Sequence, residues 1–172
     1  MNRVNKKLKK LSALLGRENL PSESAAVSSL LKEDKEEEKE PDKKLSDQSL
    51  SANFSLYEFN CKDKNKTPVP EKYLNNTKEL VKNLEIIRAE FNKPIQIISG
   101  YRTPEYNKSI GGAARSLHMF GKAADIKING VTSKEIKTVI LKLIDDGKIS
   151  QGGVGSYPGF VHYDVRGVKA RW

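Results

Sequence analysis

Hydrophobic and polar positions change their spacing several times between residues 70 and 166, and each spacing predicts an element. Residues 71–92 carry apolar side chains on one helical stripe and lie between Pro70 and Pro94, which predicts a long amphipathic helix. Residues 132–147 repeat that pattern behind a Thr132–Glu135 capping box. The stripes are Leu74, Leu80, Val81, Leu84, Ile87 and Phe91 in the first helix, and Ile136, Val139, Ile140, Leu143 and Ile144 in the second.

Strands are predicted where β-branched residues cluster or alternate with polar ones. Residues 95–99 and 124–128 are the first two, and residues 152–157 and 160–166 form a hairpin around Pro158-Gly159. Residues 100–116 are predicted to be a long polar loop, a feature that is usually functional inside a compact domain. The aromatic segment 54–59 is expected to pack on the domain. Together these elements predict an α+β fold, with a small antiparallel sheet, helices on one face and a cleft on the other.

Residues 1–50 lack such a pattern and are expected to be a largely disordered tail that catalysis does not need, followed by one domain over residues 51–172. Residues 33–44 are almost wholly charged and cannot bury enough apolar surface to offset the entropy of ordering. A short leucine-rich stretch over residues 8–15 leaves open an anchoring helix on a partner or a membrane. The apolar part of this segment is too short for a secretory signal, so we expect a chain outside the usual export route.

Charge separates the tail from the domain. Residues 1–50 hold 11 Lys and Arg against 10 Asp and Glu, and the remainder holds 20 against 12, so the domain carries +8 of the net +9. A basic surface suits a polyanionic partner such as nucleic acid, an anionic membrane or a cell-wall polymer. No stacked aromatic platform or recognition helix supports specific nucleic-acid binding. No apolar run approaches the roughly 20 residues of a membrane span, and the single Cys61 excludes an intrachain disulfide.

The chain contains two histidines, and strand geometry predicts that one of them shares a face with a carboxylate. Side chains alternate across a strand, so Asp125 points away from the apolar face of residues 124–128, and His162 from that of residues 160–166. When both apolar faces lie on helices, Asp125 and His162 occupy the same exposed face. His118 precedes Asp125 by seven residues. Two histidines and one carboxylate are the open three-ligand set that catalytic zinc uses.

An ordered series of motifs extends over roughly residues 51–172. It resembles the zinc D-alanyl-D-alanine carboxypeptidases and their relatives, which include cell-wall L-alanoyl-D-glutamate endopeptidases of phages and vancomycin-resistance dipeptidases. The Hedgehog signalling domain shares the fold, so the resemblance implies a domain of the Hedgehog/DD-peptidase type. The motifs are Ser99-Gly100-Tyr101-Arg102-Thr103-Pro104, Asn107, Gly111-Gly112-Ala113, Ser116-x-His118-x-x-Gly121-x-Ala123-x-Asp125 and His162-x-Asp164.

The resemblance implies a Zn²⁺ cofactor held by His118, Asp125 and His162, which match the ligand positions of that family. Iron or manganese would also suit two histidines and a carboxylate, and the resemblance rather than the spacing favours zinc. Arg102 matches an arginine that contacts substrate and assists the transition state, because a guanidinium can fork onto a carboxylate or stabilise an oxyanion. Ser116 is predicted to bind substrate or to hold the loop.

This chain differs from the family that it resembles at the position of the general base. Many relatives carry a carboxylate three residues before the second histidine, and Gly159 stands there in this chain. Asp164, two residues after His162 and on the same strand face, is our candidate for a catalytic base. Two alternatives stay open: Asp164 orients His162 through a hydrogen bond, or Asp164 is a ligand and His162 the catalytic imidazole.

The sequence therefore predicts a zinc metallopeptidase that hydrolyses peptide bonds in peptidoglycan stem peptides, as a D-Ala-D-Ala carboxypeptidase or an endopeptidase. We expect a monomer, acting as a phage or prophage lysis enzyme from the host cytoplasm or carried in a phage particle. The alternative is a metal-binding virion or cell-wall-binding module that has lost catalysis, an interpretation that Gly159 keeps open.

Overall fold

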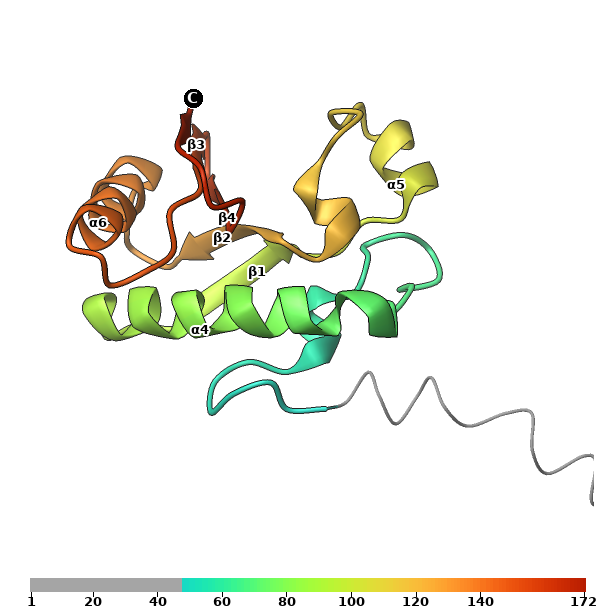
Figure 1. The fold of residues 1–172 in the computed structure, drawn as a ribbon, viewed down its shortest axis with the longest axis horizontal. Coiled ribbons are helices and arrows are strands. Elements are labelled where there is room, and N and C mark those ends of the chain that lie inside the picture. The colour runs from blue at the N-terminus through green and yellow to red at the C-terminus, as the bar shows by residue number, and fades with distance from the viewer. Residues whose placement is uncertain (1–47) are drawn as a thin grey trace, which may run out of the picture. The chain divides into compact units, whose positions relative to one another are not determined.

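In the computed structural model, which describes residues 48–172, five strands form one sheet in the order β1-β2-β4-β3-β5 (Figure 1). The α+β class expected from the sequence is confirmed, since helices pack against this single sheet. The strands are β1 Ile95–Ser99, β2 Ala123–Ile128, β3 Gly153–Tyr157, β4 Phe160–Asp164 and β5 Ala170–Arg171.

The sheet is mixed, whereas the sequence predicted an antiparallel one. Strands β1, β2, β4 and β3 pair antiparallel, but β5 pairs parallel with β3. Because β3 and β4 form a hairpin, β4 ends beside the start of β3. Residues 165–169 then carry the chain to the free edge of β3, from which β5 runs in the same direction as β3. A two-residue strand has no alternation to recognise, so the hydrophobic pattern could not predict it.

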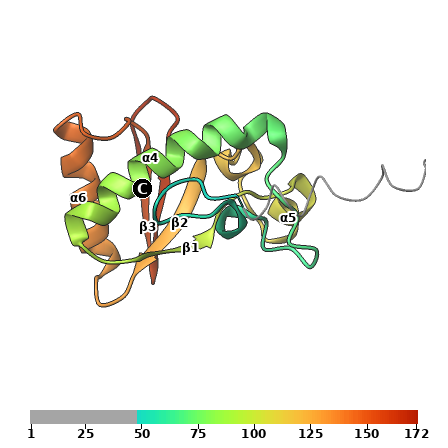
Figure 2. The same cartoon turned by 90° about the horizontal axis from the view of Figure 1, so that it is seen from below.

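Two long helices cover one face of the sheet. Helix α4 Leu74–Phe91 follows a 3-10 turn, η2 Glu71–Tyr73, and ends at Asn92 in a left-handed conformation. Helix α6 Ser133–Asp145 begins at the expected capping box, in which the Thr132 N–H donates to the Glu135 carboxylate over 2.7 Å and the Glu135 N–H donates to the Thr132 hydroxyl over 3.2 Å. Figure 2 shows α4 lying across the strands. Both predicted helices are therefore confirmed.

A single hydrophobic core joins these helices to the sheet. The side chains that β2 and β4 contribute to it are the alternate positions expected from the sequence, and each is fully buried. Burial of a large apolar side chain stabilises the fold by about 1.5–3 kcal/mol, so this face of the sheet is held firmly against the helices. These residues of β2 and β4 are Ala124, Ile126, Ile128, Val161 and Tyr163.

The aromatic segment before α4 completes the core. Leu56 and Phe59 of the 3-10 helix η1 Leu56–Phe59 are buried, as is Phe54, which confirms that this segment packs on the domain. The Tyr101 N–H donates to the Phe59 carbonyl over 2.7 Å. A Cβ at Gly100 would lie 2.6 Å from the Phe59 backbone, so the close approach of the two chains requires glycine there. The segment thus supports the backbone that enters the loop after β1.

Residues 100–116 contain a short helix, α5 Pro104–Ser109, where the sequence predicted only loop. Thr103 caps it by accepting a hydrogen bond from the Tyr106 N–H over 3.1 Å, and Pro104 occupies the first turn. The Thr-Pro-Glu start is therefore a helix signal that the prediction overlooked. A 3-10 helix, η3 Leu117–Phe120, follows and leads directly into β2.

The tail predictions, including the leucine-rich stretch 8–15 and the charged segment 33–44, lie outside the described residues. None of the helices within residues 48–172 is long and apolar enough to cross a membrane. At the start of this range, Ser49 forms a bridge with Ser55, the Leu56 N–H donates to the Gln48 carbonyl over 2.8 Å, and Leu50 packs on the core.

We predict that a chain lacking residues 1–47 keeps the melting temperature of the full chain, while removal of residues 48–50 as well lowers it. The second truncation loses two backbone hydrogen bonds, from the Leu50 N–H to the Phe54 carbonyl and from the Leu56 N–H to the Gln48 carbonyl, and it loses the packing of Leu50. Together these contacts are worth about 2–4 kcal/mol. Thermal unfolding of the three chains followed by circular dichroism checks this. Failure of the first truncated chain to fold would show that the tail completes the domain.

Candidate metal centre

Three separate elements bring His118, Asp125 and His162 together. His118 lies on η3, Asp125 on β2 and His162 on β4, and all three are buried. In the β2–β4 pairing Asp125 stands directly opposite His162, so the two side chains project from the same face of adjacent strands. The prediction from strand alternation that these two residues share a face is confirmed.

The donor atoms of the three side chains form a tight triangle. His118 Nε2 lies 3.2 Å from His162 Nδ1 and 3.2 Å from Asp125 Oδ1, and His162 Nδ1 lies 3.0 Å from Asp125 Oδ1. This is the one group of at least three His, Cys, Asp or Glu side chains within residues 48–172 that could hold a metal ion. The three atoms are therefore directed at a common point.

Each histidine has an acceptor for its other ring nitrogen. His118 Nδ1 lies 2.7 Å from the Gly100 carbonyl oxygen, and His162 Nε2 lies 3.0 Å from Asp164 Oδ2. With a metal in the triangle, donation of these N–H protons would leave His118 Nε2 and His162 Nδ1 with free lone pairs that face the ion. Such outer hydrogen bonds select the tautomer and hold the ring in the orientation that a metal needs.

Asp164 lies on the far side of the His162 ring from the triangle and is fully buried. Its carboxylate accepts hydrogen bonds from the Gly153 N–H over 3.0 Å and from the Arg166 guanidinium over 2.8 and 2.6 Å. Asp164 is absent from the residues that line the cleft above the triangle. This arrangement gives Asp164 contact with His162 and no access to a substrate in the cleft.

Arg102 and Ser116, the other residues singled out in the sequence, both line that cleft. The Arg102 guanidinium donates to Asp125 Oδ2 over 2.5 Å and to the Ser99 hydroxyl over 2.9 Å. Asp125 thus uses one oxygen for Arg102 and directs the other at the histidines. Ser116 lies immediately before η3, in the N-cap position of the turn that carries His118.

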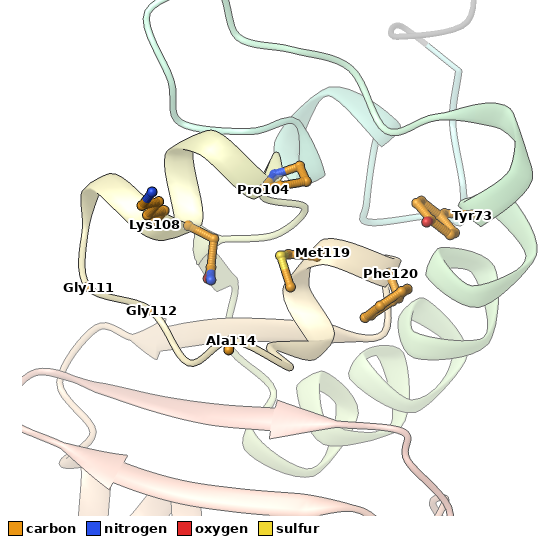
Figure 3. Close-up of a pocket in the computed structure, with 9 residues that line it drawn as sticks. Tyr73, Pro104, Lys108, Gly111, Gly112, Ala114, Met119 and Phe120 are labelled. Atoms are coloured by element: carbon orange, nitrogen blue, oxygen red, sulfur yellow. The ribbon is translucent and has the colours of Figure 1, made fainter.

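The cleft has a volume of about 600 Å³, within the range of small-ligand sites. A second hollow of about 500 Å³ lies beside it and shares Gly111 and Gly112 with it. Figure 3 shows that Met119 and Phe120 line this second hollow together with residues of α5, while none of the three candidate ligands lines it. The short η3 turn thus presents His118 to the metal cleft and its next two side chains to a different surface.

Comparison with known families decides the identity at the family level. A family model described as Peptidase M15 matches residues 52–164. The chain belongs to the Peptidase M15 family.

Curated relatives of this M15 chain share its central part. It is 38% identical over 87 residues to the Peptidoglycan L,D-endopeptidase MepK of Escherichia coli K12, which covers 46% of this chain and 44% of that protein. It is 36% identical over 85 residues to the Probable peptidoglycan L,D-endopeptidase MepK of Haemophilus influenzae, which covers 45% and 42% respectively. The matches therefore span less than half the length of these relatives.

The donor triangle of this M15 chain fits a tetrahedral zinc ion. Ligand atoms at about 2.0–2.1 Å from a tetrahedral zinc lie about 3.3 Å from one another, and the three separations observed are 3.0–3.2 Å. Two imidazole nitrogens and one carboxylate oxygen are also the donor types found at catalytic zinc. The residues present therefore fit the metal that the sequence predicted.

The electrostatics of the triangle favour an ionised carboxylate and couple metal binding to pH. Burial by itself would raise the pKa of Asp125, but hydrogen bonds from both histidines lower it well below its usual value. Burial lowers the pKa of His118. Burial also opposes protonation of His162, yet its hydrogen bonds to Asp125 and Asp164 raise its pKa overall. A metal ion and a proton compete for His162 Nδ1, so metal affinity should rise with pH.

Sequence reasoning missed several residues that line the cleft. Trp172 places its indole 5.3 Å from the His162 ring, between centroids, and donates to the Tyr157 hydroxyl over 2.6 Å. A side chain at Gly155 would collide with that indole. The missed residues are Ile110, Arg115, Tyr157, Phe160, Arg166 and Trp172. An aromatic residue at each end of the Pro158-Gly159 turn was a usable signal, but nothing local to the sequence places Trp172 beside β3.

We predict that the wild-type chain binds one zinc ion and that His118→Ala and Asp125→Ala each reduce binding by at least about a hundredfold, because each removes one of three ligands. Elemental analysis gives the stoichiometry. Trp172 is the single tryptophan of the chain and lies beside His162, so its fluorescence should change on zinc addition. Asp145→Ala, an exposed carboxylate on α6, is the control and should bind normally. Wild-type metal content in both ligand variants would refute the site.

Proposed function

We propose that this chain is a zinc peptidase that hydrolyses a peptide bond in peptidoglycan stem peptides, with the L,D-endopeptidase type favoured over a D-Ala-D-Ala carboxypeptidase. Membership of the Peptidase M15 family supports peptide hydrolysis, and the likeness to MepK supports the substrate class and the bond type. The observation that carries the proposal is the buried triangle of His118, Asp125 and His162 at a cleft that Arg102 also lines.

In this proposal the chain's own residues divide into three roles. His118, Asp125 and His162 hold the zinc ion. Bound zinc supplies Lewis acidity and makes water nucleophilic near neutral pH. Arg102 holds Asp125 through one nitrogen, and its Nη1 has no hydrogen-bond partner within residues 48–172, so it can donate to a peptide carbonyl oxygen in the cleft. Ser116, on the cleft rim, binds the peptide or holds the loop.

Asp164 is assigned as the residue that orients His162, in place of the general-base role preferred from the sequence. A general base must reach the proton that it abstracts, whereas Asp164 is fully buried behind the His162 ring. Burial would raise the pKa of Asp164, but hydrogen bonds from His162, Arg166 and the Gly153 N–H lower it far below its usual value. A carboxylate so stabilised in its ionised form is a poor proton acceptor at neutral pH.

A non-catalytic metal-binding module remains the second candidate, and one observation favours it. Asp125 is the only carboxylate among the residues of the 48–172 domain that line the cleft. Gly159, at the position of the usual base, has no side chain to contribute. The role in phage lysis, the location in host cytoplasm or phage particle, and the monomeric state stay predictions from the sequence.

We predict that the zinc-loaded full chain cuts defined muropeptides at an L,D bond, with product masses that identify the bond in mass spectrometry. His118→Ala should release no product, because a ligand is missing. The exposed-surface variant Asp145→Ala should match the wild type. Zinc-loaded protein that binds muropeptides in calorimetry and leaves them intact would establish the non-catalytic module instead.

We predict that Asp164→Asn weakens zinc affinity by about 10–100-fold and that excess zinc restores much of the turnover, as expected when an orienting hydrogen bond is weakened. Metal titration and turnover under saturating zinc are the two measurements, and a circular dichroism spectrum of the folded chain at the assay temperature is the control for folding, since loss of the buried pair with Arg166 should lower the melting temperature. A general base predicts a different result: full metal content with turnover at least about a hundredfold lower. A ligand role predicts loss of the metal itself.

A further inference from the structure

The metal cleft has two unlike walls. One is aromatic: Tyr157 and Phe160, which flank the turn between β3 and β4, stack with centroids 4.7 Å apart and planes at 13°. Trp172 extends this wall toward His162. The facing wall is the segment that follows α5 and includes Arg115 and Ser116. Figure 1 shows this segment and the β3–β4 hairpin as separate parts of the chain that rise from the same side of β2.

Three arginines line this cleft within the described part of the chain, and two of them are already paired. Arg102 is bound to Asp125 and Arg166 to Asp164. Arg115 is exposed and makes no ion pair or side-chain hydrogen bond with any residue of the range 48–172. Arg115 is therefore the cation of the cleft that is free to take an anion from outside.

The charge of the cleft also favours an anionic ligand. The net charge of the three arginines and of the two aspartates paired with them is +1. A divalent ion held by the triangle would raise this net charge to +3. A guanidinium binds a carboxylate through two parallel N–H donors, which gives both attraction and orientation. The aromatic wall opposite offers ring faces that suit small apolar side chains and the flat faces of peptide groups.

We propose that Arg115 forms a carboxylate-binding subsite on the rim of the metal cleft, which selects stem peptides that carry a free carboxylate close to the scissile bond. The inference rests on the proposed function, since that function supplies the substrate. Two carboxylates of a stem peptide share this chemistry: the α-carboxylate of the D-glutamyl residue and the carboxylate at the end of the peptide. Arg115 acts in binding, so its loss should raise KM and leave kcat nearly unchanged.

The test compares three peptides with four proteins. The peptides are a stem peptide with both carboxylates free, the same peptide amidated at the D-glutamyl α-carboxylate, and the same peptide amidated at its end. The proteins are the zinc-loaded full chain, Arg115→Ala, Arg115→Lys and the control Arg88→Ala, an arginine of α4 that does not line the cleft. Calorimetry gives Kd for each pair, and product analysis gives KM and kcat.

We expect Arg115→Ala to bind the free-carboxylate peptide about tenfold more weakly than wild type, the size of a charge-assisted contact at an exposed site. One of the two amidated peptides should bind the wild type and Arg115→Ala equally, because it lacks the carboxylate that Arg115 contacts. The position of its amide group therefore identifies that carboxylate. Arg115→Lys should keep part of the affinity, and Arg88→Ala should match wild type.

An effect of Arg115→Ala that is equal on all three peptides, or absent on all three, overturns the subsite. A wild type that binds none of the peptides overturns it as well. Failure of the proposed function looks different: the peptides stay uncut while the binding pattern holds, and the subsite then stands without catalysis. Cleavage that is insensitive to Arg115→Ala removes the subsite and leaves the proposed function intact.

Discussion

The antiparallel register of β2 on β4 is the constraint on which the site depends. It places Asp125 opposite His162 on one face, and it places Ala124 and Tyr163, the next pair, on the buried face. A shift of one residue in β2 would send Asp125 into the hydrophobic core and a hydrophobic side chain into the cleft. The burial energy of the core face therefore maintains the geometry of the metal centre on the other face.

A second layer of hydrogen bonds converts this approximate placement into an oriented set of donors. His118 is held by a backbone carbonyl, that of Gly100, while His162 is held by the buried carboxylate of Asp164. Arg166 neutralises Asp164, so an ionised group persists in the interior at moderate cost. In the motif His162-x-Asp164 the two side chains share one strand face and contact each other, the arrangement on which the proposed orienting role of Asp164 rests.

The cleft above the metal centre is assembled from parts that are far apart in the chain. The loop after α5 contributes Arg115, the β3–β4 hairpin contributes aromatic rings, and Trp172 closes the wall by lying along β3. The position of the Trp172 indole requires glycine at residue 155, because a Cβ there would collide with the ring. The cleft of this Peptidase M15 chain combines a cationic rim and an aromatic wall around the His118, Asp125 and His162 triangle, and the proposed binding of an anionic peptide rests on these features.

The sequence by itself determined the two helices, four of the strands and the shared face of Asp125 and His162, because periodic burial is written into local spacing. The motif series added His118, which lies on a turn whose direction no periodicity predicts. Only the tertiary structure decided the parallel β5, the helix within residues 100–116, and the side of the His162 ring on which Asp164 lies. Strand alternation assigns a residue to a face, but two residues on one face can touch opposite ends of the same imidazole. The distinction between a base and an orienting group depends on side-chain rotamers and on hydrogen-bond partners from other elements. Local sequence spacing predicts neither of them.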